Sequence, residues 1–118
     1  MTINFDNLPE ETKKKIKDLT ALSQNIEFLT QQKIQIDTSL RETELAIEEL
    51  TKATPDTTVY KSIGGILVKT DRTKLLEEKK SLKVTLEMRS KTLEQKTERT
   101  RKNFESMQKS LQAELQYK

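Results

Sequence analysis

The sequence predicts an all-α dominated protein, a long antiparallel two-helix coiled coil with a central β-hairpin. The 118-residue chain is 32% hydrophobic and 35% charged, which suits a narrow coiled-coil seam better than a layered core. Glycine and proline occur only at residue 9 and within residues 55–65, so two long segments have no helix breaker. Both segments carry apolar residues at coiled-coil spacing. We expect one domain over residues 1–118.

The first helix is expected over residues 9–53. Pro9 followed by Glu10 and Glu11 is typical of a helix N-terminus. The predicted a positions are Leu19, Ile26, Lys33, Leu40 and Ile47, and the d positions are Leu22, Leu29, Ile36, Thr43 and Leu50. All but Lys33 and Thr43 are leucine or isoleucine, which is a strong coiled-coil signal.

The second helix is expected over residues 71–117, with Asp71 as its N-cap. Its predicted seam is less regular: Leu75, Leu82, Leu86, Leu93, Met107 and Leu111 are apolar, whereas Arg89, Lys96, Thr100 and Asn103 are polar. Two helices of similar length on either side of a short reversal predict antiparallel pairing within the chain. Leu50 should then face Leu75, while the stems of Arg89 and Lys96 cover the leucines and isoleucines opposite.

A β-hairpin is expected over residues 57–69, where β-branched and aromatic residues flank two glycines. Gly64-Gly65 fits a two-residue type I′ turn. The segment is longer than a helix connection needs, and an isolated hairpin is marginal in water and leaves unpaired edges. We therefore predict an oligomerisation module made of Val59, Tyr60, Ile63, Gly64, Gly65, Ile66, Leu67 and Val68.

Composition excludes several kinds of chemistry. The chain has no cysteine and no histidine, so a thiolate nucleophile, a disulfide, a zinc site and a Ser-His relay are excluded. No phosphate loop or set of metal ligands is present, so we expect neither an enzyme nor a cofactor. The longest apolar run has six residues and the N-terminus lacks signal-peptide features, so we expect a cytoplasmic protein without a membrane partner.

Nucleic acid is a less favoured partner. The second helix is basic, as nucleic-acid binding requires. However, glutamate and lysine are interleaved along it without aromatic spacing, which favours a solvated helix face.

The hairpin "VYKSIGGILVK" and the run "LEMRSKTLE" ending at Glu94 resemble the β-type subunits of prefoldin, a hexameric chaperone. The resemblance covers nearly the whole chain, although Gln95-Lys96 and Thr100 depart from the family pattern. It implies a hetero-hexamer of two α subunits, with two hairpins each, and four β subunits, with one. The hairpins would form a double β-barrel from which the coiled coils project. The resemblance also implies that unfolded polypeptides are held at the tips without nucleotide and passed to a group II chaperonin.

The tips of such a coiled coil are the two chain ends, where apolar residues gather. The candidates for client binding are Ile3, Phe5, Leu8, Ile16, Phe104, Met107, Leu111, Leu115 and Tyr117. The heptad register favours an ordinary seam role for Leu19, Met107 and Leu111, whereas Ile3, Phe5 and Tyr117 lie outside the strong heptads. Phe28, at a c position, is either a scattered exposed side chain or a client contact.

Two functions from different classes therefore remain. One is an ATP-independent holdase that uses these tips. The alternative is a structural spacer or tether that assembles through its hairpin and has inert tips.

Overall fold

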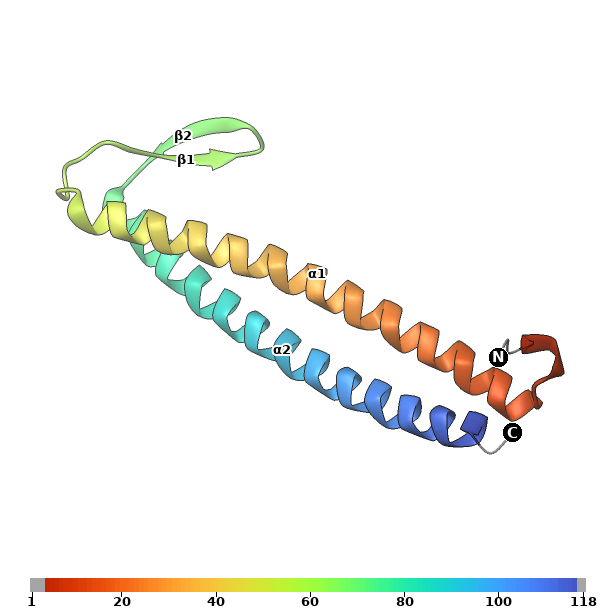
Figure 1. The fold of residues 1–118 in the computed structure, drawn as a ribbon. Helices are drawn as coiled ribbons and strands as arrows, with labels where there is room; N and C mark the ends of the chain where they lie inside the picture. The colour runs from red at the N-terminus through yellow and green to blue at the C-terminus, as the bar shows by residue number, and fades with distance from the viewer. Residues whose placement is uncertain (1–3, 117–118) are drawn as a thin grey trace. The chain divides into compact units, whose positions relative to one another are not determined.

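The computed structural model describes residues 4–116 and contains two long helices with a hairpin between them (Figure 1). A short 3₁₀ turn, Phe5–Asn7, precedes helix α1, Glu10–Lys52; strands β1, Val59–Ile63, and β2, Ile66–Thr70, precede helix α2, Arg72–Gln116. The predicted fold class is confirmed. Within residues 4–116, no helix is apolar over a stretch long enough to cross a membrane.

The chain divides into two compact units. The hairpin unit comprises residues 33–92, and the terminal unit comprises the residues up to 32 together with those from 93 onward. Cross-helix hydrogen bonds between α1 and α2 occur in both: Thr12 to Glu114 in the terminal unit and Ser90 to Asp37 in the hairpin unit. Each unit is therefore built on an antiparallel pair of helical segments.

Local signals set the ends of both helices. The carbonyl of Pro9 accepts the first helical hydrogen bond, from Lys13 N at 3.0 Å, and α1 ends shortly before Pro55, since a residue that precedes proline avoids helical geometry. Asp71 is the N-cap of α2, as predicted. Its carbonyl accepts from Leu75 N at 2.9 Å, and its carboxylate accepts from the backbone N–H of Thr73 at 3.3 Å.

The seam predicted for α1 is confirmed by burial. All ten predicted a and d residues are buried or half-buried, and Leu29, Thr43 and Leu50 are the most enclosed of them. The buried hydroxyl of Thr43 donates to the carbonyl of Ser39 at 2.8 Å. A threonine can therefore occupy the seam without leaving a polar atom unsatisfied.

The seam predicted for α2 is confirmed by burial at Leu75, Leu86, Leu93, Thr100, Met107 and Leu111, and it is wrong at the other four positions. Leu82 is 40% exposed, and Arg89, Lys96 and Asn103 are also exposed. The buried and half-buried positions instead follow a three-four spacing through Leu76, Lys79, Lys83, Leu86, Ser90, Leu93, Thr97, Thr100, Phe104, Met107 and Leu111. Lysine, serine and threonine occupy several positions of this seam, while Leu82 and Met88 lie outside it, so apolar residues alone misplace part of the register.

Several polar seam residues are hydrogen-bonded. Asp37 accepts from Ser90 on the opposite helix at 2.8 Å and from Lys33 at 2.7 Å. The hydrogen bond from Lys33, followed by that from Ser90, holds the pKa of Asp37 below its usual value. On α2 the buried hydroxyl of Thr97 donates to the carbonyl of Leu93. Within the hairpin unit, the two helices are thus held together in part by a polar contact, the hydrogen bond from Ser90 to Asp37.

The hairpin turns at the two glycines. Strands β1 and β2 pair antiparallel from Val59 opposite Thr70 to Ile63 opposite Ile66. Gly64 and Gly65 have φ angles of 55° and 85°, as a two-residue type I′ turn requires. Within residues 4–116, no other residue has a positive φ.

Gly65→Ala is expected to loosen the hairpin, because a side chain disfavours a positive φ by roughly 1–2 kcal/mol. A Cβ at this position would meet no neighbouring atom within 4 Å, so the effect is conformational and not a clash. Hydrogen–deuterium exchange across residues 59–70 should become about tenfold faster, since 1.4 kcal/mol corresponds to a factor of ten. Ser62→Ala, in the adjacent extended strand, is the control; equal exchange in both variants would contradict this account of the turn.

Candidate functional site: the hairpin and the chain ends

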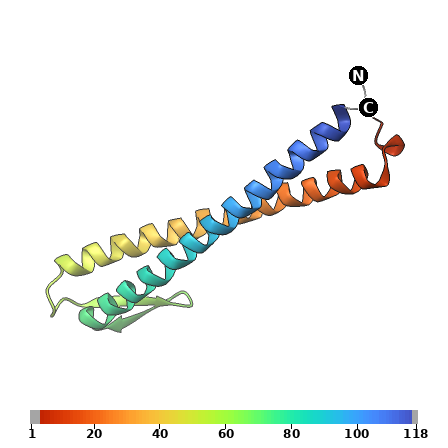
Figure 2. The ribbon, with the colours of Figure 1, turned by 90° about the horizontal axis from the view of Figure 1, so that it is seen from below.

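The base of the hairpin is anchored to both helices of its unit. Leu50, Leu75 and Leu76 form a buried cluster against which Val59 packs. Arg72, the first residue of α2, donates to the carbonyl of Leu50 at 2.7 Å and so satisfies one of the free carbonyls at the end of α1. Figure 2 shows the hairpin alongside these helix segments. The strands are thereby held in a defined orientation on the helix pair.

The two faces of the hairpin have different neighbours. Residues opposite one another in the register share a face, so Val59, Lys61 and Ile63 lie on the same face as Val68 and Ile66. This is the face directed toward the helices. Lys61 forms an ion pair of 2.8 Å with Glu78 on α2, and its hydrogen bond lowers the pKa of the Glu78 carboxyl.

Much of the hairpin's apolar surface has no cover in the single chain. The exposed side chains are Tyr60, Ile63, Ile66, Leu67 and Val68, and the exposed fraction of Leu67 reaches 72%. Of the predicted apolar hairpin residues, only Val59 is half-buried. The sheet formed by the described residues has two strands, so each strand has an edge without a partner strand. Such an edge, flanked by apolar side chains on both faces, is a surface suited to pairing with further strands.

The predicted client-binding residues have different degrees of exposure. Ile3 and Tyr117 lie outside the described residues. Phe5 is 40% exposed, and Lys13 Nζ lies 5.7 Å from the centre of its ring. Leu111 is only 8% exposed. The remaining members of the set are half-buried: Leu8, Ile16, Phe104, Met107 and Leu115.

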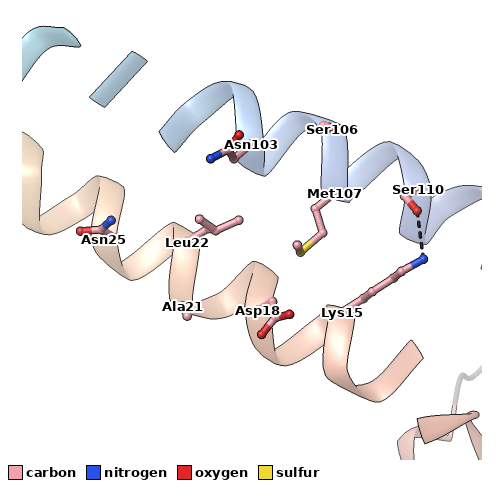
Figure 3. Close-up of a pocket in the computed structure, with 9 residues that line it drawn as sticks. All are labelled: Lys15, Asp18, Ala21, Leu22, Asn25, Asn103, Ser106, Met107 and Ser110. Carbon is pink, nitrogen blue, oxygen red and sulfur yellow. Dashed lines mark hydrogen bonds between the residues drawn. The ribbon is translucent and has the colours of Figure 1, made fainter. Parts of the chain in front are cut away.

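An open groove runs between α1 and α2 within the terminal unit (Figure 3). Its lining residues are Lys15, Asp18, Ala21, Leu22, Asn25, Asn103, Ser106, Met107 and Ser110. Leu22 and Met107 point toward one another across it from the two helices. Because the small side chains Ala21, Ser106 and Ser110 leave room beside this pair, the groove presents an apolar floor with a polar margin.

Two residues that line this groove, Lys15 and Ser110, belong to a cluster of cross-helix polar contacts. We call this cluster the polar clasp: Thr12, Lys15, Ser110 and Glu114. The hydroxyl of Thr12 donates to the Glu114 carboxylate at 3.1 Å, and Lys15 Nζ donates to Ser110 Oγ at 3.1 Å. Lys15 also forms an ion pair with Glu114, and this hydrogen bond raises the pKa of Lys15. The polar clasp was not predicted from the sequence, although Thr12 and Lys15 lie one heptad before Leu19 and Leu22.

Within the part of the chain that the structure describes, no group of three or more acidic, histidine or cysteine residues could hold a metal ion. The candidate sites are two surfaces, the exposed hairpin and the groove with the polar clasp in the terminal unit.

A paired helical hairpin with an exposed two-stranded sheet is the architecture of a chaperone subunit family, and residues 13–118 match the family described as "Prefoldin subunit". The chain belongs to this family. The resemblance found in the hairpin and second-helix motifs is thus confirmed.

Individual relatives agree with this assignment. The chain is 37% identical over 105 residues to the prefoldin subunit beta of Archaeoglobus fulgidus, covering 89% of this chain and 90% of that one. It is 31% identical over 111 residues to the prefoldin subunit beta of Thermococcus onnurineus, covering 94% and 96%. The crystal structure of the prefoldin beta subunit from Thermococcus strain KS-1 superposes with a TM-score of 0.82 at 28% identity, covering 92% of this chain and 96% of that one.

Proposed function

We propose that this chain is the β-type subunit of a cytoplasmic, hexameric, ATP-independent holdase that has two α and four β subunits. The observation that carries the proposal is the exposed apolar hairpin on a chain of the prefoldin subunit family. The hairpin joins neighbouring subunits, including the α partner, and the chain ends hold unfolded polypeptides. The complex then passes the client to a group II chaperonin.

Assembly through the hairpin is supported by its geometry. Val59 packs on the leucine cluster and Lys61 is paired with Glu78, so the base of the hairpin is fixed before any partner binds. The exposed residues nearer the turn, Ile63, Ile66 and Leu67, remain available. A rigid platform with unpaired edges loses little conformational entropy on pairing with other strands.

Client binding at the chain ends is supported by the chemistry found there. Leucine, isoleucine, methionine and phenylalanine are present at both ends of the chain, and methionine adapts to partners of irregular shape. The groove beside Leu22 and Met107 has room for an apolar side chain. Its polar margin lets the flanking backbone of an unfolded client remain solvated or hydrogen-bonded.

Removal of residues 1–9 together with residues 109–118 is expected to abolish protection of clients while leaving assembly intact. The assembled wild-type complex should suppress light scattering from a denatured client without ATP, whereas the truncated complex should scatter as much as the client alone. The reason is that the truncation removes most of the apolar residues at the ends but leaves the hairpin untouched.

The matched control is Leu45→Ser, which removes an exposed apolar side chain of α1 in the hairpin unit and should protect as well as wild type. If the truncated complex protected clients fully, the ends would be inert and the chain would be a spacer or tether.

A further inference from the structure

The helix pair of the terminal unit covers most of the apolar side chains that are proposed to bind clients. Among the described residues of this unit, the exposed large hydrophobic side chains are Phe5 and Phe28. Leu111 is buried, and Leu8, Ile16 and Met107 are half-buried. A side chain that packs in the seam cannot contact a client at the same time. The groove beside Leu22 and Met107 exposes only part of this apolar surface, so full contact of a client with Leu111 requires the ends of the two helices to separate.

The polar clasp occupies the seam positions that must separate. Thr12 and Lys15 continue the a and d register backward from Leu19 and Leu22, and Thr12 is 3% exposed. Both side chains contact Glu114 on the opposite helix. Within the terminal unit, the α1 side of the seam thus changes from apolar to polar at this point, and all three contacts cross from α1 to α2.

Polar contacts of this kind fix alignment more than they add stability. The side chains of Lys15 and Glu114 are 25% and 29% exposed, and partly exposed ion pairs contribute little to stability. A polar group at a seam position nevertheless specifies the register of a coiled coil. When the helix ends part, water solvates both charges again, so less is lost than when a leucine layer opens.

We propose that the polar clasp is a latch that sets how readily the ends of α1 and α2 open to admit an apolar segment of an unfolded polypeptide. In the closed state the clasp aligns the two helices, while Leu111 is buried and Leu8 is half-buried. In the open state these leucines become available to the client. This inference rests on the proposed binding of clients at the chain ends.

The latch is tested by one variant that opens it and one that closes it. Glu114→Lys places a second cation beside Lys15, and like charges repel about as strongly as the original pair attracts. In the assembled complex, hydrogen–deuterium exchange over residues 10–19 and 107–116 should become roughly threefold to tenfold faster. This is the size of effect expected when a partly exposed ion pair is replaced by a repulsive pair. The same complex should hold more of a denatured client.

The closing variant combines Thr12→Leu, Lys15→Leu and Glu114→Leu, which extends the leucine seam. It should exchange more slowly and protect clients less than wild type. The closing variant strengthens the helix pair. It therefore still tests the latch if Glu114→Lys unfolds the ends of α1 and α2. The charge swap Lys15→Glu with Glu114→Lys should return exchange and protection toward wild type. Glu48→Lys, which breaks an exposed pair with Lys52 within α1, is the control and should change neither.

The two measurements separate the inference from the function on which it rests. Unchanged exchange in both the opening and the closing variant would overturn the latch. Altered exchange with equal client protection in all variants would overturn the link between opening and binding. If exchange responds as expected but even wild type fails to protect any client, the proposed function fails while the conformational part of the latch stands.

Discussion

Replacing Ile66 and Leu67 together with lysine is expected to abolish assembly while leaving the helix content of the chain unchanged. These two residues are 64% and 72% exposed and lie on opposite faces of β2, so the change places a charge on each face. Burying an unpaired charge in an interface is strongly unfavourable. The mass of the complex formed with the α-type partner should fall to that of separate subunits, and circular dichroism should be unaltered.

The matched control for this prediction is Ile34→Lys with Leu45→Lys, which removes two apolar side chains of similar exposure from α1 and adds the same charge. This control should assemble normally. Full assembly of the hairpin variant would show that the interface lies elsewhere on the chain.

Leu76→Ala is expected to lower the free energy of unfolding substantially, by about 2–3 kcal/mol. Leu76 is 7% exposed and packs with Leu50 and Leu75 under Val59. Its truncation leaves a cavity at the point where the hairpin joins both helices. Urea denaturation followed by circular dichroism should show a lower midpoint, and exchange at the base of the hairpin should accelerate.

Leu82→Ala provides the comparison for Leu76→Ala and also tests the register of α2. The sequence pattern predicts Leu82 on the seam, whereas the structure leaves it 40% exposed. We expect its truncation to change stability by less than about 1 kcal/mol, as is usual away from the core. Equal destabilisation by the two changes would contradict the register described for α2.

The first helix and the hairpin were predictable from the sequence because their signals are local and consistent. In α1 a nearly unbroken series of leucine and isoleucine defines the seam, and the burial of Leu29 and Leu50 follows from it. Gly64-Gly65 between β-branched residues leaves few alternatives to a tight turn. In both cases propensity and pattern point to the same structure.

The register of α2 could not be obtained in the same way. Ser90 and Thr97 lie on its seam, whereas Val84 and Met88 are exposed, so the apolar pattern of α2 taken alone is misleading. The correct register depends on pairing with α1, for example through the hydrogen bond between Ser90 and Asp37. Contacts between residues so far apart in the chain are not visible in the periodicity of one helix.

The two candidate sites also differ in how far the sequence predicts them. Exposure of the hairpin residues followed from the small size of a two-stranded sheet. The polar clasp was missed because threonine and lysine at seam positions carry no apolar signal, although extending the heptads of α1 by one repeat reaches both Thr12 and Lys15.

The hairpin segment also joins the two helices covalently, and this has a consequence for behaviour in dilute solution. The end of α1 and the start of α2 are linked by fewer than twenty residues, so each is present near the other at a high effective concentration that dilution cannot lower. Pairing between subunits has no such link and weakens as the protein is diluted. Folding of the helix pair beside the hairpin is therefore a property of one chain, whereas association between chains depends on how much protein is present.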